Sequence, residues 1–162
     1  MPGTVAVAVK RYELGKMSKW MHDNLVIGDR IELMGALGNF YYTPNTRPTV
    51  GLVAGGTGIT PLFTLILGIL TNPNDLTKIS LVYCSSEKDI LFFEELKELA
   101  RLHHDKFEVH FTTKSELLND LRDNLPDSGE KPLVVMCGPT GFISVCKKVL
   151  SQRKPAYSFE IL

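Results

Sequence analysis

The stretch from Pro48 to Asn74 carries no charged residue, and a run of glycines interrupts it in the middle. Its first part, Val50–Ala54, is short and apolar, whereas Pro61–Leu70 is rich in Leu and Ile and has the length of a helix. A strand that is buried in a parallel sheet lacks polar alternation, so this pattern predicts a buried strand followed by a buried helix. The segment is long enough to cross a bilayer. The central glycines and Pro61 nevertheless favour the strand and helix over a membrane span.

After residue 49, segments typical of strands and of helices alternate to the end of the chain. The predicted strands are Val50–Ala54, Lys78–Tyr83, Phe107–Thr112, Leu133–Cys137 and Tyr157–Ile161. The predicted helices are Pro61–Leu70, Ile90–Leu102, Ser115–Asp123 and Gly141–Ser151. Such alternation predicts βαβ units with right-handed crossovers. The expected fold is therefore α/β, with a five-stranded parallel sheet in the order 3-2-1-4-5 and helices on both faces.

Three of these helices carry local signals. Thr60 is expected to cap the first helix, with Pro61 at its first helical position. Ser86 and Asp89 have the spacing of a capping box before the second. In the last helix, one apolar stripe is expected at helical spacing, formed by Phe142, Val145, Cys146, Val149 and Leu150.

The first 45 residues show a different pattern, rich in short alternating segments. Strands are predicted at Thr4–Val9, Arg30–Met34 and Phe40–Tyr42, with a short helix at Ser18–Asn24. Three strands are too few to close a barrel, so a partial antiparallel β-barrel is expected here. The predicted domains are residues 1–45 and 46–162, with a linker at 45–48.

Composition excludes several classes of protein. The 162 residues include 18 basic and 18 acidic side chains, and 44% are hydrophobic. This balance argues against disorder and against nucleic-acid binding through a basic surface. The three cysteines have no C-x-x-C spacing, so neither a disulfide scaffold nor a zinc site is expected. The apolar stretch before Lys10 and Arg11 lacks the pattern of a signal peptide, and a reducing compartment, the cytoplasm, is the expected location.

The strongest candidate site is the segment Gly55-Gly56-Thr57-Gly58-Ile59-Thr60-Pro61, which joins the first strand to the first helix. Glycines allow a ligand to approach the backbone closely, and a helix N-terminus attracts phosphate. The segment lacks the Gly-Lys-Ser/Thr of a Walker loop, and Pro61 stands where a Rossmann fingerprint has its third glycine. A tight strand-to-helix turn without a ligand is the alternative interpretation.

Two further segments are candidates. Cys137-Gly138-Pro139 ends the fourth strand, and if that strand lies beside the first, both loops face one crevice. Cys137 is then either a thiol at a nucleotide site or an ordinary buried cysteine. Gly15-Lys16-Met17-Ser18 precedes a short helix and is either a second anion site or a solvated turn.

These motifs resemble, in the correct order, those of cytochrome b5 reductases, within the wider ferredoxin-reductase group. The resemblance rests on Gly55–Pro61, on Ser86–Leu91 followed by Glu95-Leu96, and on Met136–Pro139. It extends to the end of that family's flavin domain through Gly15–Ser18 and Ile27–Asp29. It covers nearly the whole chain and implies that residues 1–45 end an FAD-binding barrel and that 46–162 form an NAD(P)-binding domain.

The resemblance implies an oxidoreductase that transfers a hydride from NADH or NADPH to FAD and passes electrons to a haem protein such as cytochrome b5. It implies that Lys16, Met17 and Ser18 hold the flavin pyrophosphate. Thr60 would touch the flavin, beside Pro61. The residues implied to hold the nicotinamide nucleotide are Gly55, Gly56, Thr57, Gly58, Cys137, Gly138 and Pro139. Cys137 would align the nicotinamide ring, and Cys137 and Thr57 are the candidate catalytic residues. A nucleotide-binding module that has lost the flavin is the alternative function.

This sequence departs from the family pattern at three places. No Arg-x-Tyr-Ser/Thr stretch of the flavin domain precedes Thr4, so we expect weak FAD binding by this chain. Thr140, Gly141 and Phe142 replace the usual prolines and methionine after Cys-Gly-Pro. Lys114 stands where many members carry an aspartate that disfavours a 2′-phosphate. NADPH should therefore be accepted, with Ser85 as a further donor, unless Lys114 simply faces water.

Overall fold

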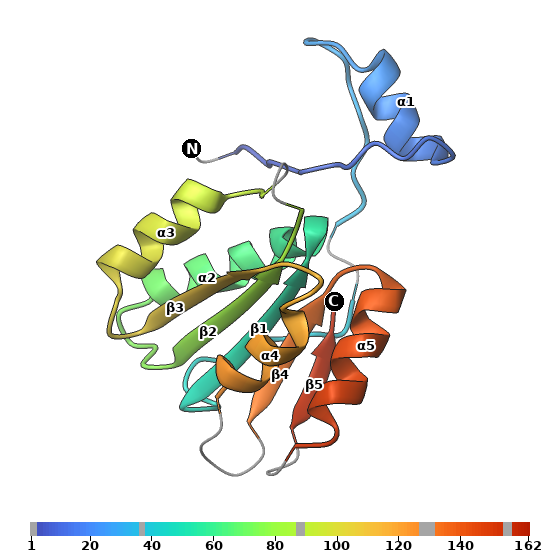
Figure 1. The fold of residues 1–162 in the computed structure, drawn as a ribbon. Helices are drawn as coiled ribbons and strands as arrows, with labels where there is room; N and C mark the ends of the chain where they lie inside the picture. Colours follow the sequence, from blue (N-terminus) through green and yellow to red (C-terminus); the bar gives the residue numbers. More distant parts are fainter. Residues whose placement is uncertain (1–2, 36–37, 87–89, 127–131, 154–156) are drawn as a thin grey trace. The chain divides into compact units, whose positions relative to one another are not determined.

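The computed structural model describes residues 3–35, 38–86, 90–126, 132–153 and 157–162. The chain divides into two compact units, Met1–Asn39 and Phe40–Leu162. The second unit contains a parallel sheet with helices on both of its faces (Figure 1).

The sheet has five strands in the order β3-β2-β1-β4-β5, all parallel, which confirms the predicted topology. The strands are β1 (Thr49–Gly55), β2 (Lys78–Cys84), β3 (Phe107–Thr112), β4 (Leu133–Cys137) and β5 (Ser158–Ile161). β1 is central: Val50 aligns with Ile79 of β2 on one side and with Leu133 of β4 on the other. Its apolar residues are buried on both faces, as the uncharged sequence predicts.

Four α-helices cover the sheet among the described residues of the second unit (Figure 1). They are α2 (Ile59–Thr71), α3 (Phe93–Leu102), α4 (Leu117–Asp123) and α5 (Thr140–Leu150). Successive strand residues point to opposite faces. Leu52 therefore packs in one core with residues of α2 and α3, and Val53 packs in another with residues of α4 and α5.

The start of α2 differs from the prediction. A 3-10 turn, η1 (Gly56–Gly58), leads directly into the helix, which begins at Ile59 and not at Pro61. Thr60 is therefore not the cap: it lies inside the first turn, and its hydroxyl donates to the carbonyl of Thr57 at 3.1 Å. The glycines permit the tight turn that starts the helix two residues early.

The start of α3 also differs. The helix begins at Phe93 and not at Ile90, and Asp89 of the predicted capping box lies outside the described residues. Phe92 precedes the helix with φ of 58°, an unusual conformation for a bulky residue. Its ring stacks on that of Phe63, with centroids 4.3 Å apart, so side-chain packing holds the backbone in this conformation.

The apolar stripe of α5 is only partly as predicted. Cys146 and Leu150 are buried, but Val145 is 47% exposed and the buried position is Ile143. The stripe is thus centred on Ile143, Cys146 and Leu150, a narrower face than the one expected.

The described residues before β1 do not form the expected partial antiparallel barrel. The helix of the first unit, α1 (Lys16–Asn24), starts two residues before the predicted one. Within residues 3–35 and 38–48 the structure contains no strand, so the strands predicted at Thr4–Val9, Arg30–Met34 and Phe40–Tyr42 are wrong. Alternation specifies which face a strand would bury, but a strand also needs a hydrogen-bonded neighbour.

Candidate functional site

The two glycine loops predicted to share a crevice are in direct contact. They follow β1 and β4, which are neighbours in the sheet, with Ala54 aligned to Cys137. A Cβ atom on Gly58 would overlap the carbonyl group of Cys137 and lie 2.7 Å from the nitrogen of Gly138. Only glycine at position 58 allows the backbones to approach this closely. The structure thus brings the two segments together at the carboxyl ends of adjacent parallel strands, where open α/β sheets bind ligands.

Gly56 leaves one side of the loop after β1 open. Its φ of 55° lies in the left-handed region, which glycine adopts without strain. A Cβ atom there would meet no atom within 4 Å, so the side of Gly56 that lacks a side chain faces open space. This is the geometry of a cradle in which a ligand can lie against the backbone.

Thr57 and Pro61 flank the start of α2. Thr57 lies in η1, and Pro61 lies in the first turn of the helix. The N-terminal end of this 13-residue helix carries a positive partial charge, which stabilises an anion placed against it. The loop can therefore receive a phosphate group without a basic side chain.

Cys137 ends β4, is half-buried and is a thiol. Burial raises the pKa of the Cys137 thiol, and a hydrogen bond with the Gly138 backbone offsets this only partly. The thiol is thus neutral at pH 7, which suits contact with a ring better than nucleophilic attack. Gly138 and Pro139 then lead into α5.

Sequence reasoning missed the role of Phe142, which it treated only as part of an apolar stripe and as a departure from the family. Its half-buried ring packs against Gly55 and Gly138, the glycines at the ends of the two loops. The sequence holds one signal for this role: an aromatic residue, Phe142, stands three residues after the Pro139 of Cys-Gly-Pro, about one helical turn further on.

Ser85 and Lys114 lie at the same end of the sheet, after β2 and β3, which are one and two strands away from β1. Ser85 directly follows β2, and its backbone N–H donates to the carbonyl of Thr112, the last residue of β3, at 3.3 Å. Lys114 is exposed and follows β3 by two residues. Burial raises the pKa of Cys84, the last residue of β2, and the positive charge of Lys114 opposes this.

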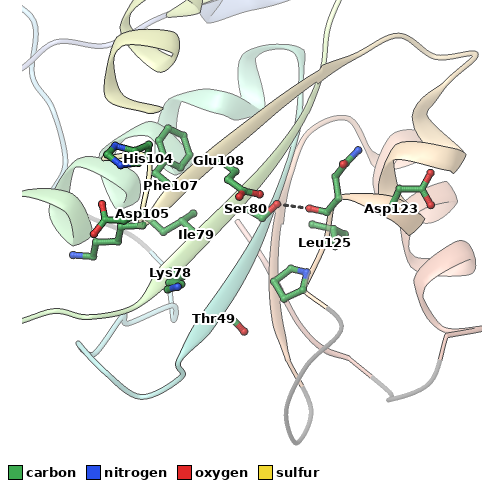
Figure 2. A pocket seen from close by; sticks show the side chains of 13 residues that line it. Thr49, Lys78, Ile79, Ser80, His104, Asp105, Phe107, Glu108, Asp123 and Leu125 are labelled. Atoms are coloured by element: carbon green, nitrogen blue, oxygen red, sulfur yellow. Dashed lines mark hydrogen bonds between the residues drawn. The ribbon is translucent and has the colours of Figure 1, made fainter. Parts of the chain in front are cut away.

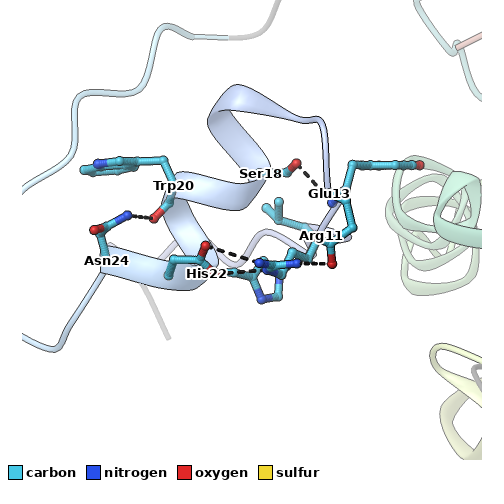
Figure 3. Close-up of polar contacts among 9 residues, drawn as sticks. Arg11, Glu13, Ser18, Trp20, His22 and Asn24 are labelled. Carbon is cyan, nitrogen blue, oxygen red and sulfur yellow. Dashed lines mark hydrogen bonds and ion pairs between the residues drawn. The ribbon is translucent and has the colours of Figure 1, made fainter.

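Lys16, Met17 and Ser18 lie in the first turn of α1, in the other unit. The hydroxyl of Ser18 accepts a hydrogen bond from the Tyr12 backbone at 3.3 Å (Figure 3). Lys16 is exposed and lines a cavity of about 340 Å³ together with Lys19 and Trp20. Met17 is 69% exposed. Arg11 links the segment before α1 to that helix through an ion pair with Asp23, 2.9 Å from Nε to Oδ1 (Figure 3).

A second cavity, of about 290 Å³, lies at the opposite end of the sheet, where the strands begin (Figure 2). It is lined by the first residues of three strands, Thr49, Lys78 and Phe107, and sequence analysis did not predict it. Ser80 donates a hydrogen bond to the carbonyl of Asn124 in its wall. The cavity lies at the amino ends of β1, β2 and β3, whereas the glycine loops follow the carboxyl ends of β1 and β4, so this cavity is separate from the candidate nucleotide site.

In the described parts of the chain, no group of three or more His, Cys, Asp or Glu side chains is arranged to hold a metal ion. The same residues form no helix with the length and apolarity needed to cross a membrane.

Comparison with known protein families confirms the resemblance seen in the sequence. The model of the oxidoreductase NAD-binding domain matches residues 52–148, and that of the oxidoreductase FAD-binding domain matches residues 1–42. A relative from Meyerozyma guilliermondii, named NADH-cytochrome b5 reductase 1, is 39% identical over 158 residues. A protein of the same name from Dictyostelium discoideum is 40% identical over 149 residues. These alignments cover 90% and 85% of this chain but 55% and 51% of the relatives, so the chain spans about half of their length.

Solved structures of the same kind of protein also resemble this chain. The cytochrome b5 reductase domain of Ulva prolifera nitrate reductase is 29% identical, with a TM-score of 0.79 over 91% of this chain and 66% of that one. The ferredoxin-NADP+ reductase of Plasmodium falciparum, at 20% identity and a TM-score of 0.70 over 96% of this chain and 70% of that one, shares the fold.

Proposed function

The chain belongs to the oxidoreductase NAD-binding domain family, and from this premise we propose that it binds NADH or NADPH in the crevice between its two glycine loops. The observation that carries the proposal is the contact of Gly58 with the Cys137–Gly138 peptide. This contact joins the two loops through backbone atoms alone, and the side of Gly56 that lacks a side chain stays open for a ligand. The residues present therefore fit a dinucleotide.

The site residues can be given roles on this basis. Gly55–Gly58 and the start of α2 would hold the phosphates next to the nicotinamide, because a helix N-terminus and a glycine backbone favour an anion. Cys137 and Thr57 would contact the nicotinamide end, where the neutral thiol excludes water from one side of the ring. The bound nucleotide would supply the hydride, and the protein would hold it in place.

We propose that the hydride acceptor is FAD, and that the electrons pass to a haem protein such as cytochrome b5. The match of the FAD-binding model to residues 1–42 supports this, as do the names of the relatives. Lys16, Met17 and Ser18 would face the flavin pyrophosphate with one cation, one hydroxyl and the start of α1. Thr60, hydrogen-bonded to Thr57, would contact the flavin. We also propose the cytoplasm as its location, since all three cysteines are thiols, the form that a reducing compartment maintains.

The second candidate is a nucleotide-binding module without flavin. In the segments predicted as strands at Thr4–Val9 and Arg30–Met34, Val5 and Leu33 are 78% and 62% exposed. A flavin-binding barrel buries such apolar side chains between its strands, so their exposure favours a chain that holds the flavin weakly. We therefore propose that the chain alone binds FAD weakly.

The experiment is a nucleotide titration combined with a visible spectrum of the purified chain. NADH binding is measured by calorimetry for the unaltered protein, for Gly56→Ala and for Gly68→Ala. Gly56→Ala introduces strain and a methyl group at the open side of the loop, so its NADH affinity should fall about tenfold. Gly68 lies in the middle of α2 with no atom within 4 Å of an added Cβ, so it is the control.

The two candidates give different spectra. Flavin absorbance that survives purification supports the complete oxidoreductase in this chain and contradicts the weak FAD binding proposed here. A colourless protein that binds NADH supports the module. Absence of NADH binding by the unaltered protein would refute the proposed function in both forms.

We propose that nucleotide choice depends on Lys114. An ammonium group at the carboxyl end of β3 can pair with a 2′-phosphate, and Ser85 at the end of β2 can add a hydroxyl donor. Because Lys114 is exposed, the preference for NADPH should be only several-fold.

A further inference from the structure

The ring of Phe142 occupies the space that side chains on two different glycines would need. A Cβ atom on Gly55 would lie 2.7 Å from Cδ1 and 2.9 Å from Cε1 of this ring. A Cβ atom on Gly138 would lie 2.9 Å from the same Cδ1. Real Cβ atoms do not approach other atoms so closely, so both positions must be glycine while Phe142 keeps its place.

These two glycines belong to the two halves of the crevice. Gly55 is the last residue of β1, and Gly138 directly follows β4. A Cβ on Gly138 would also lie 3.1 Å from the Cα of Gly55, so the strand ends already touch each other beside the ring. The ring is thus a shared support for both loops, from the face of the sheet that α5 covers.

Phe142 differs in this from the other apolar residues of α5. Ile143, Cys146 and Leu150 are buried in the core formed with α4 and the strands. Phe142 is only half-buried: it packs against the margin of this core, and its ring also lies against Gly55 and Gly138. Its removal should therefore disturb the two loops as well as the margin of the core.

We infer that Phe142 is a positioning residue for the nicotinamide end of the nucleotide. Its ring sets the separation between the Gly55–Gly58 loop and the Cys137–Gly138 peptide, and hence the width of the crevice. The inference rests on the proposed function, because it assigns the crevice to NADH or NADPH. It concerns the loops and requires no contact between Phe142 and the ligand.

The test is a double-mutant cycle of Gly55→Ala and Phe142→Leu. Gly55→Ala alone presses a methyl group into the ring and should weaken NADH binding about tenfold. Phe142→Leu alone removes the plane of the ring and should weaken it about fivefold. In the double variant the methyl group meets a smaller side chain, so the two losses should not add, and affinity should recover to within about threefold of Phe142→Leu.

Two further measurements separate positioning from general damage. Affinity for AMP, which keeps only the adenine half of NADH, should change less than about twofold in Phe142→Leu, because Ser85 and Lys114 follow other strands. Val145→Ala is the matched control on the same helix, since Val145 is 47% exposed. It should leave NADH affinity and urea unfolding almost unchanged.

The outcomes are distinct. If the unaltered protein fails to bind NADH, the proposed function fails and the role of Phe142 with it. If it binds NADH but the two losses add, or Phe142→Leu weakens AMP as much as NADH, the positioning role fails and the proposed function stands. Coupled losses confined to NADH support the inference.

Discussion

The hydroxyl of Tyr42 donates a 2.7 Å hydrogen bond to Oδ2 of Asp75, a carboxylate that is 1% exposed. The same carboxylate accepts the backbone N–H of Thr77 at 3.0 Å, and the hydroxyl oxygens of Tyr42 and Thr77 are hydrogen-bonded at 2.9 Å. Burial by itself raises the pKa of Asp75, but the hydrogen bonds from Thr77 and Tyr42 outweigh it, and the pKa is lowered. The chain segment that enters the second unit is thereby fastened to the turn between α2 and β2.

Tyr42→Phe should destabilise the protein at pH 7 by about 1–3 kcal/mol, because a buried carboxylate loses one of its donors. Urea unfolding measures this, and Tyr41→Phe is the control, since Tyr41 is 85% exposed. The pKa of Asp75 is lowered on folding, so the stabilisation it gives is present above its ordinary pKa of 3.8 and is lost as the pH falls through the folded value. The difference between Tyr42→Phe and the unaltered protein should shrink there. A constant difference down to pH 2 would contradict this account.

The pKa of Tyr42 leads to a second prediction, for stability at alkaline pH. Burial first, and then its hydrogen bond with Asp75, raises the pKa of Tyr42 to about 12, despite the opposing hydrogen bond with Thr77. A raised pKa stabilises the fold below pH 10, the ordinary value, and this contribution is lost between pH 10 and about 12. Burial also raises the pKa of Tyr83, so the absorbance titration of tyrosinate should lose only part of its late change in Tyr42→Phe. An unchanged late amplitude in the variant would show that Tyr42 does not titrate there.

Gly58→Ala should be among the most damaging single methyl additions in the chain. Its Cβ would overlap the Cys137 carbonyl, and backbone cannot move aside as a side chain can, so we expect a loss of at least about 2 kcal/mol and of NADH binding. Gly68→Ala adds the same methyl group in the middle of α2, where space is open, and should stabilise the helix by about 0.5–1 kcal/mol. Equal unfolding midpoints for the two variants would show that the loops do not meet as described.

Cys137 should be the thiol that reacts first with N-ethylmaleimide. Burial, with a contribution from nearby Cys84, raises the pKa of Cys146 to about 12, and both of these cysteines are buried. The pKa of Cys137 is also raised, so its labelling rate should keep increasing above pH 9, the ordinary value for a thiol. NADH should slow the reaction, as peptide mass spectrometry can show. Labelling of Cys84 or Cys146 before Cys137 in the native protein would argue against this arrangement.

Lys114→Asp should reverse the preference between NADPH and NADH by several-fold, since a carboxylate repels the 2′-phosphate that an ammonium attracts. The measurement is the ratio of the two affinities, which a general loss of stability leaves unchanged. Lys147→Asp makes the same change of charge on the exposed side of α5 and is the control. An unchanged ratio in Lys114→Asp would mean that Lys114 faces water and does not read the 2′ position.

The sheet was predictable because strand-like and helix-like segments alternate along the sequence, and because the inner strands β1 and β4 are short apolar runs that are mostly buried. The strands Phe107–Thr112 and Leu133–Cys137 have the predicted bounds, and the predicted order brings the two glycine loops together. Helix starts were less predictable, since they depend on distant contacts. Thr60 looks like a cap, but the glycines before it start the helix earlier, and the φ of Phe92 depends on a ring from another helix.

The rest of the site depends on packing between segments that are far apart in sequence. That Gly55 and Gly138 must both be glycine follows from the Phe142 ring, which no local pattern reveals. The strands expected before residue 43 had the right alternation, but alternation carries no information about whether a partner strand is present.

The central place of β1 bears on how the molecule folds. Val50 pairs with Ile79, nearby in the chain, but also with Leu133, which is far from it in sequence. Closing the longer loop loses more chain entropy, so we expect β1, β2 and β3 to associate first and β4 to join them later. The proposed nucleotide site lies at that late junction. Refolding should therefore produce a species with much of the sheet formed and no affinity for NADH, and added nucleotide should speed only the final step.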